Sequence, residues 1–193
     1  MKVLVTGGAG FIGREIVRQL LLDKGNIVTV LDDYSNSSPY NISEFVNHAN
    51  FEGAVEGKIE HKELLKTIFS RNKFDIVIHA AAFKFLNIAE LQVEQCVMSN
   101  IFGSLNVLRA VKDEKKVKVC IGISTDKVSY ARNVYGCSKH IMEKLFYEAS
   151  RNYRKTKFCC VRYGNVLGTT GSVITIWEKQ IKERKSLTVT DKR

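Results

Sequence analysis

The sequence predicts an α/β protein built on a doubly wound parallel sheet. Short apolar runs rich in β-branched residues alternate with segments in which apolar residues recur at helical spacing. The first run, 2–6, leads into a glycine-rich turn and then into a helical pattern, and this alternation continues along the chain. Strands that alternate with helices form parallel sheets that carry helices on their faces, so this order predicts such a sheet.

Each expected element has its own local signal. Gly25 ends the first helix. The apolar run 74–79 predicts a buried strand, which three alanines follow. Apolar residues at helical spacing predict an amphipathic helix over 61–71 and another over 133–150, with Ile141, Leu145 and Phe146 as the apolar stripe of the latter. The remaining expected strands are 26–31, 50–56, 117–123, 157–162 and 187–190, and the remaining expected helices are 43–48, 88–111 and 172–182.

The glycine motif Gly7-Gly8-Ala9-Gly10-Phe11-Ile12-Gly13 lies between the first strand and the first helix. Gly7 permits a tight turn, Gly10 lets the backbone approach a pyrophosphate, and Gly13 lets the helix pack close to the strand. The N–H groups at the helix N-terminus, including those near Phe11 and Ile12, suit phosphates. This context predicts a Rossmann-like cofactor site, and the alternative is an ordinary strand-to-helix turn.

Asp32 ends the second strand, roughly twenty residues after the glycines, where an acidic residue binds the adenosine ribose and repels a 2′-phosphate. No arginine follows in 34–38, so the sequence favours NAD over NADP. Further cofactor contacts are expected at the end of the fourth strand and in the helix after it. These candidates are Ala80, Ala81, Ala82, Lys84 and Asn100, with a solvated loop lysine as the alternative for Lys84.

The chemical centre is expected in residues 124–139. Thr125, Asp126 and Lys127 follow a buried strand, at the kind of strand end where open α/β sheets bind ligands. Tyr135 and Lys139 stand four apart and therefore share one face of a helix. A hydroxyl, a carboxylate, two amines and a phenol thus lie within sixteen residues.

The composition limits the other classes of function. The chain has 193 residues and a net charge of +10, but its basic clusters at 112–118, 151–157 and 179–193 lack the interleaved aromatic residues of a nucleic-acid surface. It has no apolar run long enough for a membrane span and no expected signal peptide. Of the five cysteines, Cys120, Cys159 and Cys160 lie in apolar strand-like runs and are expected to be small buried hydrophobes. No metal site is expected, and we expect a cytoplasmic location.

With these residues in view, the chain resembles the extended short-chain dehydrogenase/reductase superfamily. The resemblance rests on the stretch 6–13 (TGGAGFIG) and on the Tyr-x-x-x-Lys pattern of Tyr135 and Lys139. More narrowly it resembles the nucleotide-sugar dehydratase/epimerase branch of polysaccharide biosynthesis, through 79–90, 124–127 and 162–173. It departs from that branch at Lys58, Phe85, Tyr130, Ala131 and Thr175.

The resemblance implies 4,6-dehydration of a UDP-N-acetylglucosamine-type substrate with tightly bound NAD. It implies that Tyr135 is the base, that Lys139 tunes it, and that Thr125 holds the sugar 4-hydroxyl. Asp126 would be the acid at O6, which needs a raised pKa, and Lys127 the base at C5, which needs a lowered one. Lys84 and Tyr163 would touch the cofactor, as would Tyr135 and Lys139. Asn165 and Lys127 would touch the nucleotide sugar.

Two other functions remain open at this point. A UDP-sugar 4-epimerase would need Thr125, Tyr135 and Lys139 but no acid/base pair. In that case Asp126 would only cap a helix, and Lys127 would be an ordinary surface lysine. A truncated, non-catalytic NAD-binding module is the second. We expect the cofactor domain over 1–165, and over 166–193 the start of a substrate-binding region whose remainder is mostly missing after Arg193. Family analogy implies a homodimer or higher homo-oligomer through 88–111 and 133–150.

Overall fold

The computed structural model describes residues 1–167 and 173–189, and internal contacts divide the chain into two units, Met1–Arg162 and Tyr163–Arg193. The first unit contains a six-stranded sheet in the order β3-β2-β1-β4-β5-β6. All neighbouring strands are parallel, as the sequence predicted. The strands are β1 (Lys2–Thr6), β2 (Ile27–Asp32), β3 (Phe51–Glu56), β4 (Ile76–His79), β5 (Val119–Ile123) and β6 (Lys157–Val161).

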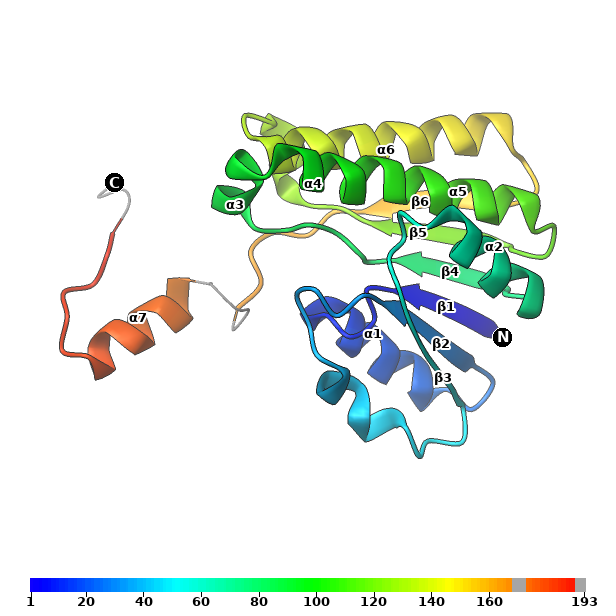
Figure 1. Cartoon of the computed structure of the whole chain (residues 1–193), viewed down its shortest axis with the longest axis horizontal. Coiled ribbons are helices and arrows are strands. Elements are labelled where there is room, and N and C mark those ends of the chain that lie inside the picture. The colour runs from blue at the N-terminus through cyan, green and yellow to red at the C-terminus, as the bar shows by residue number, and fades with distance from the viewer. Residues whose placement is uncertain (168–172, 190–193) are drawn as a thin grey trace. The chain divides into compact units, whose positions relative to one another are not determined.

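Helices cover both faces of this sheet (Figure 1). One face carries α1 (Phe11–Leu22) and the 3-10 helix η1 (Pro39–Phe45), and the other carries α2 (Lys62–Arg71), α5 (Ser104–Asp113) and α6 (Val134–Asn152). The connection from β4 to α5 runs through α3 (Leu86–Leu91), α4 (Val93–Val97) and the π-helix η2 (Met98–Gly103). The 3-10 helix η3 (Asp126–Tyr130) joins β5 to α6.

Two apolar clusters fix the helices to the sheet. Val17 and Leu21 of α1 pack with Val3, Val5 and neighbouring strand residues on one face. The larger cluster on the other face joins the strands to α2, α5 and α6, and its fully buried members include Leu4, Leu31, Leu65, Phe74, Leu108, Met142 and Phe146. Every one of these side chains is at least nine-tenths buried, which accounts for most of the hydrophobic stabilisation of this unit.

Three sequence predictions about the first unit are wrong. The expected single helix 88–111 is interrupted at Gln92 and again by the π-helical turn η2. The expected helix 43–48 is instead the 3-10 helix η1, which begins at Pro39 because proline fits the first position of a helix. Ile141 was expected on the apolar stripe of α6 but is 43% exposed, and Met142 occupies the core in its place.

The second unit is described by itself. Its helix α7 (Val173–Lys182) is amphipathic, and the Trp177 indole N–H donates to the Thr188 carbonyl oxygen at 2.8 Å. Residues 187–189 form no strand, contrary to expectation, while Thr190 and Ser172 lie outside the described residues. Among the helices of the described part, none combines the length and the apolar character needed to cross a lipid bilayer.

Candidate active site

The candidate site begins where the sheet order reverses, between β1 and β4. The loops that follow these two strands touch, because a Cβ atom built on Gly7 would lie 2.5 Å from the Ala81 backbone nitrogen. Gly7 also has a φ of +72°, a conformation that side chains disfavour. This junction is the topological switch point at which open α/β sheets bind their ligands.

The glycine turn presents the N-terminus of α1 to this junction. A Cβ on Gly13 would lie 2.0 Å from the Gly7 carbonyl oxygen, so the helix can approach the strand only with glycine there. A Cβ on Gly10 would meet only that oxygen, at 3.2 Å. The first turn of α1 has no acidic residue and no side-chain cap, so no carboxylate of its own occupies the N–H groups that would bind a pyrophosphate.

Asp32 is at the end of β2 and is 8% exposed. One carboxylate oxygen accepts a hydrogen bond from the Ala9 N–H at 2.9 Å, and the other accepts from the Tyr34 N–H and the Ser37 hydroxyl. The side chain thus ties the glycine turn to the loop after β2. A carboxylate has about four lone-pair sites, so the three bonds leave acceptor capacity for a ribose hydroxyl.

Asn100 fixes the loop that follows β4. Its side chain accepts from the Phe83 N–H at 2.8 Å and donates to the Phe83 carbonyl oxygen at 3.0 Å and to the Ser138 hydroxyl at 2.9 Å. Asn100 thus holds the loop after β4 and links it to α6. Its expected contact with the cofactor stays a prediction.

Lys84 lies in this loop and is about half-buried, with its ammonium nitrogen 5.4 Å from the centroid of the Phe85 ring. Burial lowers the pKa of this amine. Ala80, Ala81 and Ala82 lie just before it and present no bulky side chain. The loop therefore offers backbone and one cation beside the glycine turn.

Sequence reasoning missed the polar centre beneath the site. His79 is fully buried, with Nδ1 2.7 Å from the Thr6 hydroxyl and Nε2 2.9 Å from the Ser104 hydroxyl. The Ser104 hydroxyl donates to the Asn100 carbonyl oxygen at 2.6 Å. Burial, and then the charge of Lys139, lower the pKa of His79 to about 3, so the ring is neutral. Only its place at the end of a buried strand could have indicated such a role.

His79 gives a pH-dependence of stability. Its pKa is about 3 when folded and about 6.5 when unfolded, so the unfolded chain binds the extra proton and stability falls as the pH drops below 6.5. Between pH 7 and pH 5 this group should remove about 2 kcal/mol from the free energy of unfolding. Urea titrations at both pH values should show a smaller loss for His79→Gln, and equal losses would contradict the assignment.

Thr125, Asp126 and Lys127 form one bonded group at the end of β5. The Thr125 hydroxyl donates to Asp126 Oδ1 at 3.0 Å, and Lys127 Nζ lies 3.1 Å from the same oxygen. The Thr125 side chain also caps η3 by accepting from the Lys127 N–H. The hydrogen bond from Lys127 is the main cause of a lowered pKa at Asp126. The condition of a raised pKa is therefore not met in this arrangement.

The start of α6 packs directly against this group. Asn133 caps the helix by accepting from the Gly136 N–H at 2.7 Å, and a Cβ on Gly136 would lie 3.0 Å from the Lys127 carbonyl oxygen. Tyr135 is 5% exposed and packs with Phe83 in a small buried cluster. Thus the group after β5, the loop after β4 and Tyr135 meet in one place.

Lys139 lies one helical turn after Tyr135 and is 2% exposed. Its amine is 3.1 Å from the Met142 sulfur. Burial lowers the pKa of Lys139 to about 8, while Cys160, Glu143 and Cys96 act in the opposite direction. At neutral pH the amine therefore still carries its proton, as a partner of a phenolate must.

Two of the predicted site residues, Tyr163 and Asn165, belong to the second unit. Their roles toward the cofactor and the nucleotide sugar stay predictions. Gly168 to Ser172, part of the stretch 162–173 that carries the resemblance, lie outside the described residues. The described residues contain no group of three or more His, Cys, Asp and Glu side chains arranged to hold a metal ion.

Comparison with known proteins places this geometry in context. A family model described as "Polysaccharide biosynthesis protein" matches residues 3–193. UDP-N-acetylglucosamine 4,6-dehydratase (inverting) from Campylobacter jejuni is 34% identical over 195 residues, a match that covers 100% of this chain and 57% of that protein. UDP-glucose 4-epimerase from Rickettsia bellii is also 34% identical, with 98% of this chain and 56% of that protein covered. The chain thus spans little more than half the length of these relatives.

Solved structures agree with the fold. The structure of Pen from Bacillus thuringiensis has a TM-score of 0.87 at 34% identity, over 98% of this chain and 58% of that one. The Thermus thermophilus UDP-glucose 4-epimerase complex with NAD has a TM-score of 0.84 at 26% identity, over 98% and 65% of the two chains. The fold described above is therefore that of NAD-binding enzymes.

Proposed function

Because the chain belongs to the polysaccharide biosynthesis protein family, we propose that it carries the cofactor site and the reacting groups of a nucleotide-sugar 4,6-dehydratase. The substrate class is UDP-N-acetylglucosamine, and the cofactor is NAD. The observation that carries the proposal is the contact between the group Thr125-Asp126-Lys127 and the start of α6, beside Tyr135. An oxidoreductase needs only the tyrosine and lysine, whereas elimination of water needs a further acid and base.

The residues of the switch point fit a dinucleotide. The N-terminus of α1 would hold the pyrophosphate, with room for it above Gly10. Asp32 would bind the adenosine ribose, and its negative charge disfavours the 2′-phosphate of NADP. Ala80, Ala81, Ala82 and Lys84 would border the remainder, with Phe11 and Ile12 at the helix end. When bound, NAD accepts a hydride from the sugar and returns it, so no external reductant is consumed.

The first step uses Tyr135 as base toward the 4-hydroxyl, which Thr125 would hold. Lys139 keeps its proton and favours the phenolate of Tyr135 by its charge. The resulting 4-ketone acidifies the proton on C5.

The elimination step uses the bonded pair Asp126 and Lys127. In the ion pair Asp126 is ionised and Lys127 is protonated, which is the wrong form for both roles. Transfer of one proton across the 3.1 Å hydrogen bond makes Asp126 a neutral acid and Lys127 a neutral base. A bound sugar that excludes water from this exposed pair favours the neutral forms, because burial disfavours charge. Lys127 would then take the C5 proton and Asp126 would protonate O6.

A UDP-sugar 4-epimerase is the second candidate. The observation that favours it is that Asp126 and Lys127 form a surface ion pair with a lowered Asp126 pKa, as a structural pair would. Incubation with UDP-N-acetylglucosamine separates the two by product. We expect a 4-keto-6-deoxy sugar, and a 4-epimer instead would contradict the dehydratase. NAD binding without UDP-sugar binding or turnover would indicate a non-catalytic module.

Gly10→Ala tests the cofactor site separately from the fold. The added methyl group meets only the Gly7 carbonyl oxygen, so the far-UV circular dichroism should not change. It occupies the space proposed for the pyrophosphate, so calorimetry should show NAD binding weakened by about tenfold or more, roughly 1.4 kcal/mol. Unchanged NAD affinity would remove the pyrophosphate from this position.

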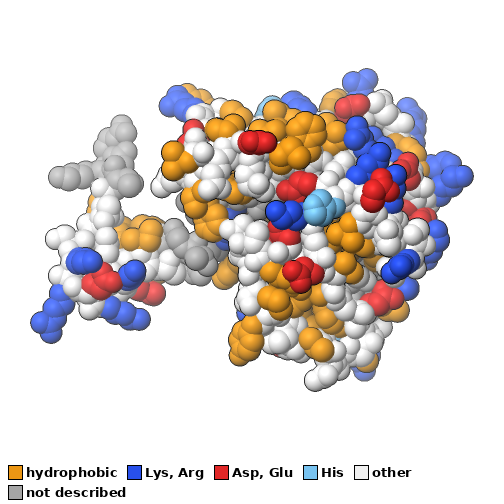
Figure 2. Space-filling model, in the orientation of Figure 1, with side chains coloured by type: hydrophobic (Ala, Val, Ile, Leu, Met, Phe, Trp, Pro, Cys, Tyr) orange, Lys and Arg blue, Asp and Glu red, His pale blue; other side chains and the backbone are white. Residues whose placement is uncertain are grey.

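We also propose a homodimer formed through α6 and the helices between β4 and β5. Hydrophobic side chains gather on the visible face over these helices (Figure 2). Met98 and Phe102 of η2 and Ile141 and Tyr147 of α6 are between 39% and 61% exposed. Sedimentation should give twice the mass of one chain, and Phe102→Glu should shift it toward the monomer; a wild-type monomer at all concentrations would contradict this.

A further inference from the structure

Glu143 and Arg162 form a partly exposed ion pair that joins α6 to the segment after β6. Arg162 Nε donates to Glu143 Oε1 at 2.8 Å and Nη2 donates to Oε2 at 2.7 Å, a two-bond fork. The Glu143 side chain is only 14% exposed, whereas that of Arg162 is 49% exposed. This pairing is the main cause of a lowered pKa at Glu143, so the carboxylate is ionised.

The pair connects the elements that carry the site. Glu143 is on α6, Arg162 follows β6, and Arg162 Nη1 donates to the Ser129 hydroxyl of η3 at 3.3 Å. The pair therefore joins α6, η3 and the segment that follows β6.

Glu143 stands four residues after Lys139, so the two side chains lie on one face of α6. The groups that interact electrostatically with the Lys139 amine are Glu143 on its own helix, Cys160 on β6, Cys96 on α4 and the neutral His79 on β4. The Tyr135 phenol lies one helical turn before it on α6. Burial raises the pKa of Cys160 to about 12 and raises that of Cys96, so both thiols are neutral. Glu143 is then the negative charge among these groups.

We propose that Glu143, paired with Arg162, is the counter-charge that favours the protonated form of the buried Lys139 amine, one helical turn after Tyr135. It is a positioning residue, because it acts through Lys139 and touches no reacting atom. The inference rests on the proposed function only in taking Tyr135 and Lys139 as the reacting pair. The positive charge of Arg162 offsets part of the negative charge of Glu143. The strength of this pair therefore determines how far Glu143 stabilises the protonated Lys139 amine.

The two partners therefore predict opposite effects. Glu143→Gln removes the negative charge and leaves that of Arg162, so the amine should lose its proton at lower pH. Arg162→Gln leaves Glu143 unopposed, so the amine should keep its proton to higher pH. If the pair only stabilised the fold, the two substitutions would not shift the pKa of Lys139 in opposite directions.

The test is a titration of the Lys139 ¹³Cε resonance in the full chain, assigned by its loss in Lys139→Arg. We expect a midpoint near pH 8 in the wild type, lower by roughly half a unit or more in E143Q and higher by a similar amount in R162Q. The matched control is Glu44→Gln, which removes the exposed carboxylate that pairs with Arg14 and Arg18 and should leave the midpoint unchanged. Circular dichroism checks folding, and R162Q remains decisive if E143Q does not fold.

An unchanged midpoint in a folded variant, or shifts of the same sign in both, would overturn the proposal. The titration needs neither sugar nor turnover. Opposite shifts in a chain that converts no UDP-sugar would therefore support the role of Glu143 while the proposed function itself failed.

Discussion

Tyr135→Phe is expected to lower kcat for UDP-sugar conversion by about 10² to 10⁴, because it removes the base and leaves the ring. Tyr135 is 5% exposed and packs against Phe83, so the phenylalanine ring should keep the same packing. NAD affinity should change little if the cofactor binds mainly to the glycine turn and the loop after β4, as proposed. The measurement is steady-state turnover together with calorimetry of NAD binding.

The matched control is Tyr147→Phe on the same helix. Tyr147 is 61% exposed, and its ring lies beside Arg151, 5.9 Å from the guanidinium carbon. This variant should retain wild-type turnover. Turnover in Y135F within a factor of a few of the wild type would show that another group takes the proton.

Gly13→Ala is expected to lower the free energy of unfolding by roughly 2–4 kcal/mol and to abolish NAD binding. The new Cβ would lie 2.0 Å from the Gly7 carbonyl oxygen and 2.8 Å from Gly8 Cα, and backbone atoms cannot rotate away. Either α1 moves off the strand or the turn opens, and both distort the phosphate site. Urea unfolding measures the first effect and calorimetry the second.

Gly25→Ala is the control for this substitution. It places a Cβ 3.2 Å from a side-chain oxygen of Asp23, outside the site, where the contact involves a movable group. Its unfolding free energy should change by less than about 1 kcal/mol. A G13A variant as stable as G25A, with normal NAD binding, would contradict the packing of α1 on the glycine turn.

Local patterns predicted the parts of this site that depend on neighbouring residues. The glycine turn follows from strand, glycines and helical spacing within 2–22, and the parallel order follows from the alternation of elements. The four-residue spacing of Tyr135 and Lys139 placed both on one helix, and the structure has them on α6. These features were readable because each is fixed by backbone rules over short distances.

The features that sequence reasoning missed or misjudged arise from contacts between distant segments. His79 bonds to Thr6 and Ser104, which lie 73 and 25 residues away, and no local pattern indicates either partner. The π-helical turn at Asn100 follows from its bonds to Phe83 and Ser138, which outweigh helix propensity. The lowered pKa of Asp126 depends on the rotamer of Lys127, which sequence spacing does not define.

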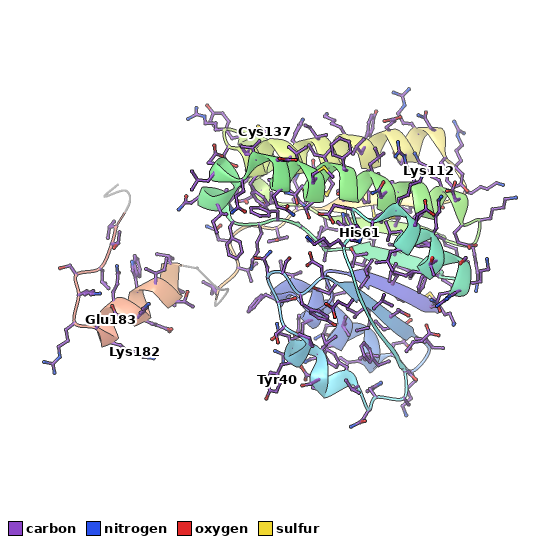
Figure 3. All side chains as sticks on the ribbon, viewed as in Figure 1. Tyr40, His61, Lys112, Cys137, Lys182 and Glu183 are labelled. Carbon is purple, nitrogen blue, oxygen red and sulfur yellow. The ribbon has the colours of Figure 1, made fainter. Side chains whose placement is uncertain are left out.

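The spatial arrangement of the basic clusters was also not predictable from local sequence. Lys112 lies at the end of α5 (Figure 3), and the Tyr153 hydroxyl after α6 donates to its carbonyl oxygen at 2.8 Å. Lysines near residues 112–118 and 151–157 therefore gather at one end of the sheet, opposite the proposed site. The sequence shows each cluster, but it does not show that the two lie close together in the fold.

The most direct test of the dehydratase uses UDP-N-acetylglucosamine with deuterium at C4 and the full chain supplied with NAD. If Tyr135, Asp126 and Lys127 act as proposed, the label should appear at C6 of a 4-keto-6-deoxy product, and D126N should yield none of that product. Deuterium found at C4 of a 4-epimer would contradict elimination and assign the site to epimerisation.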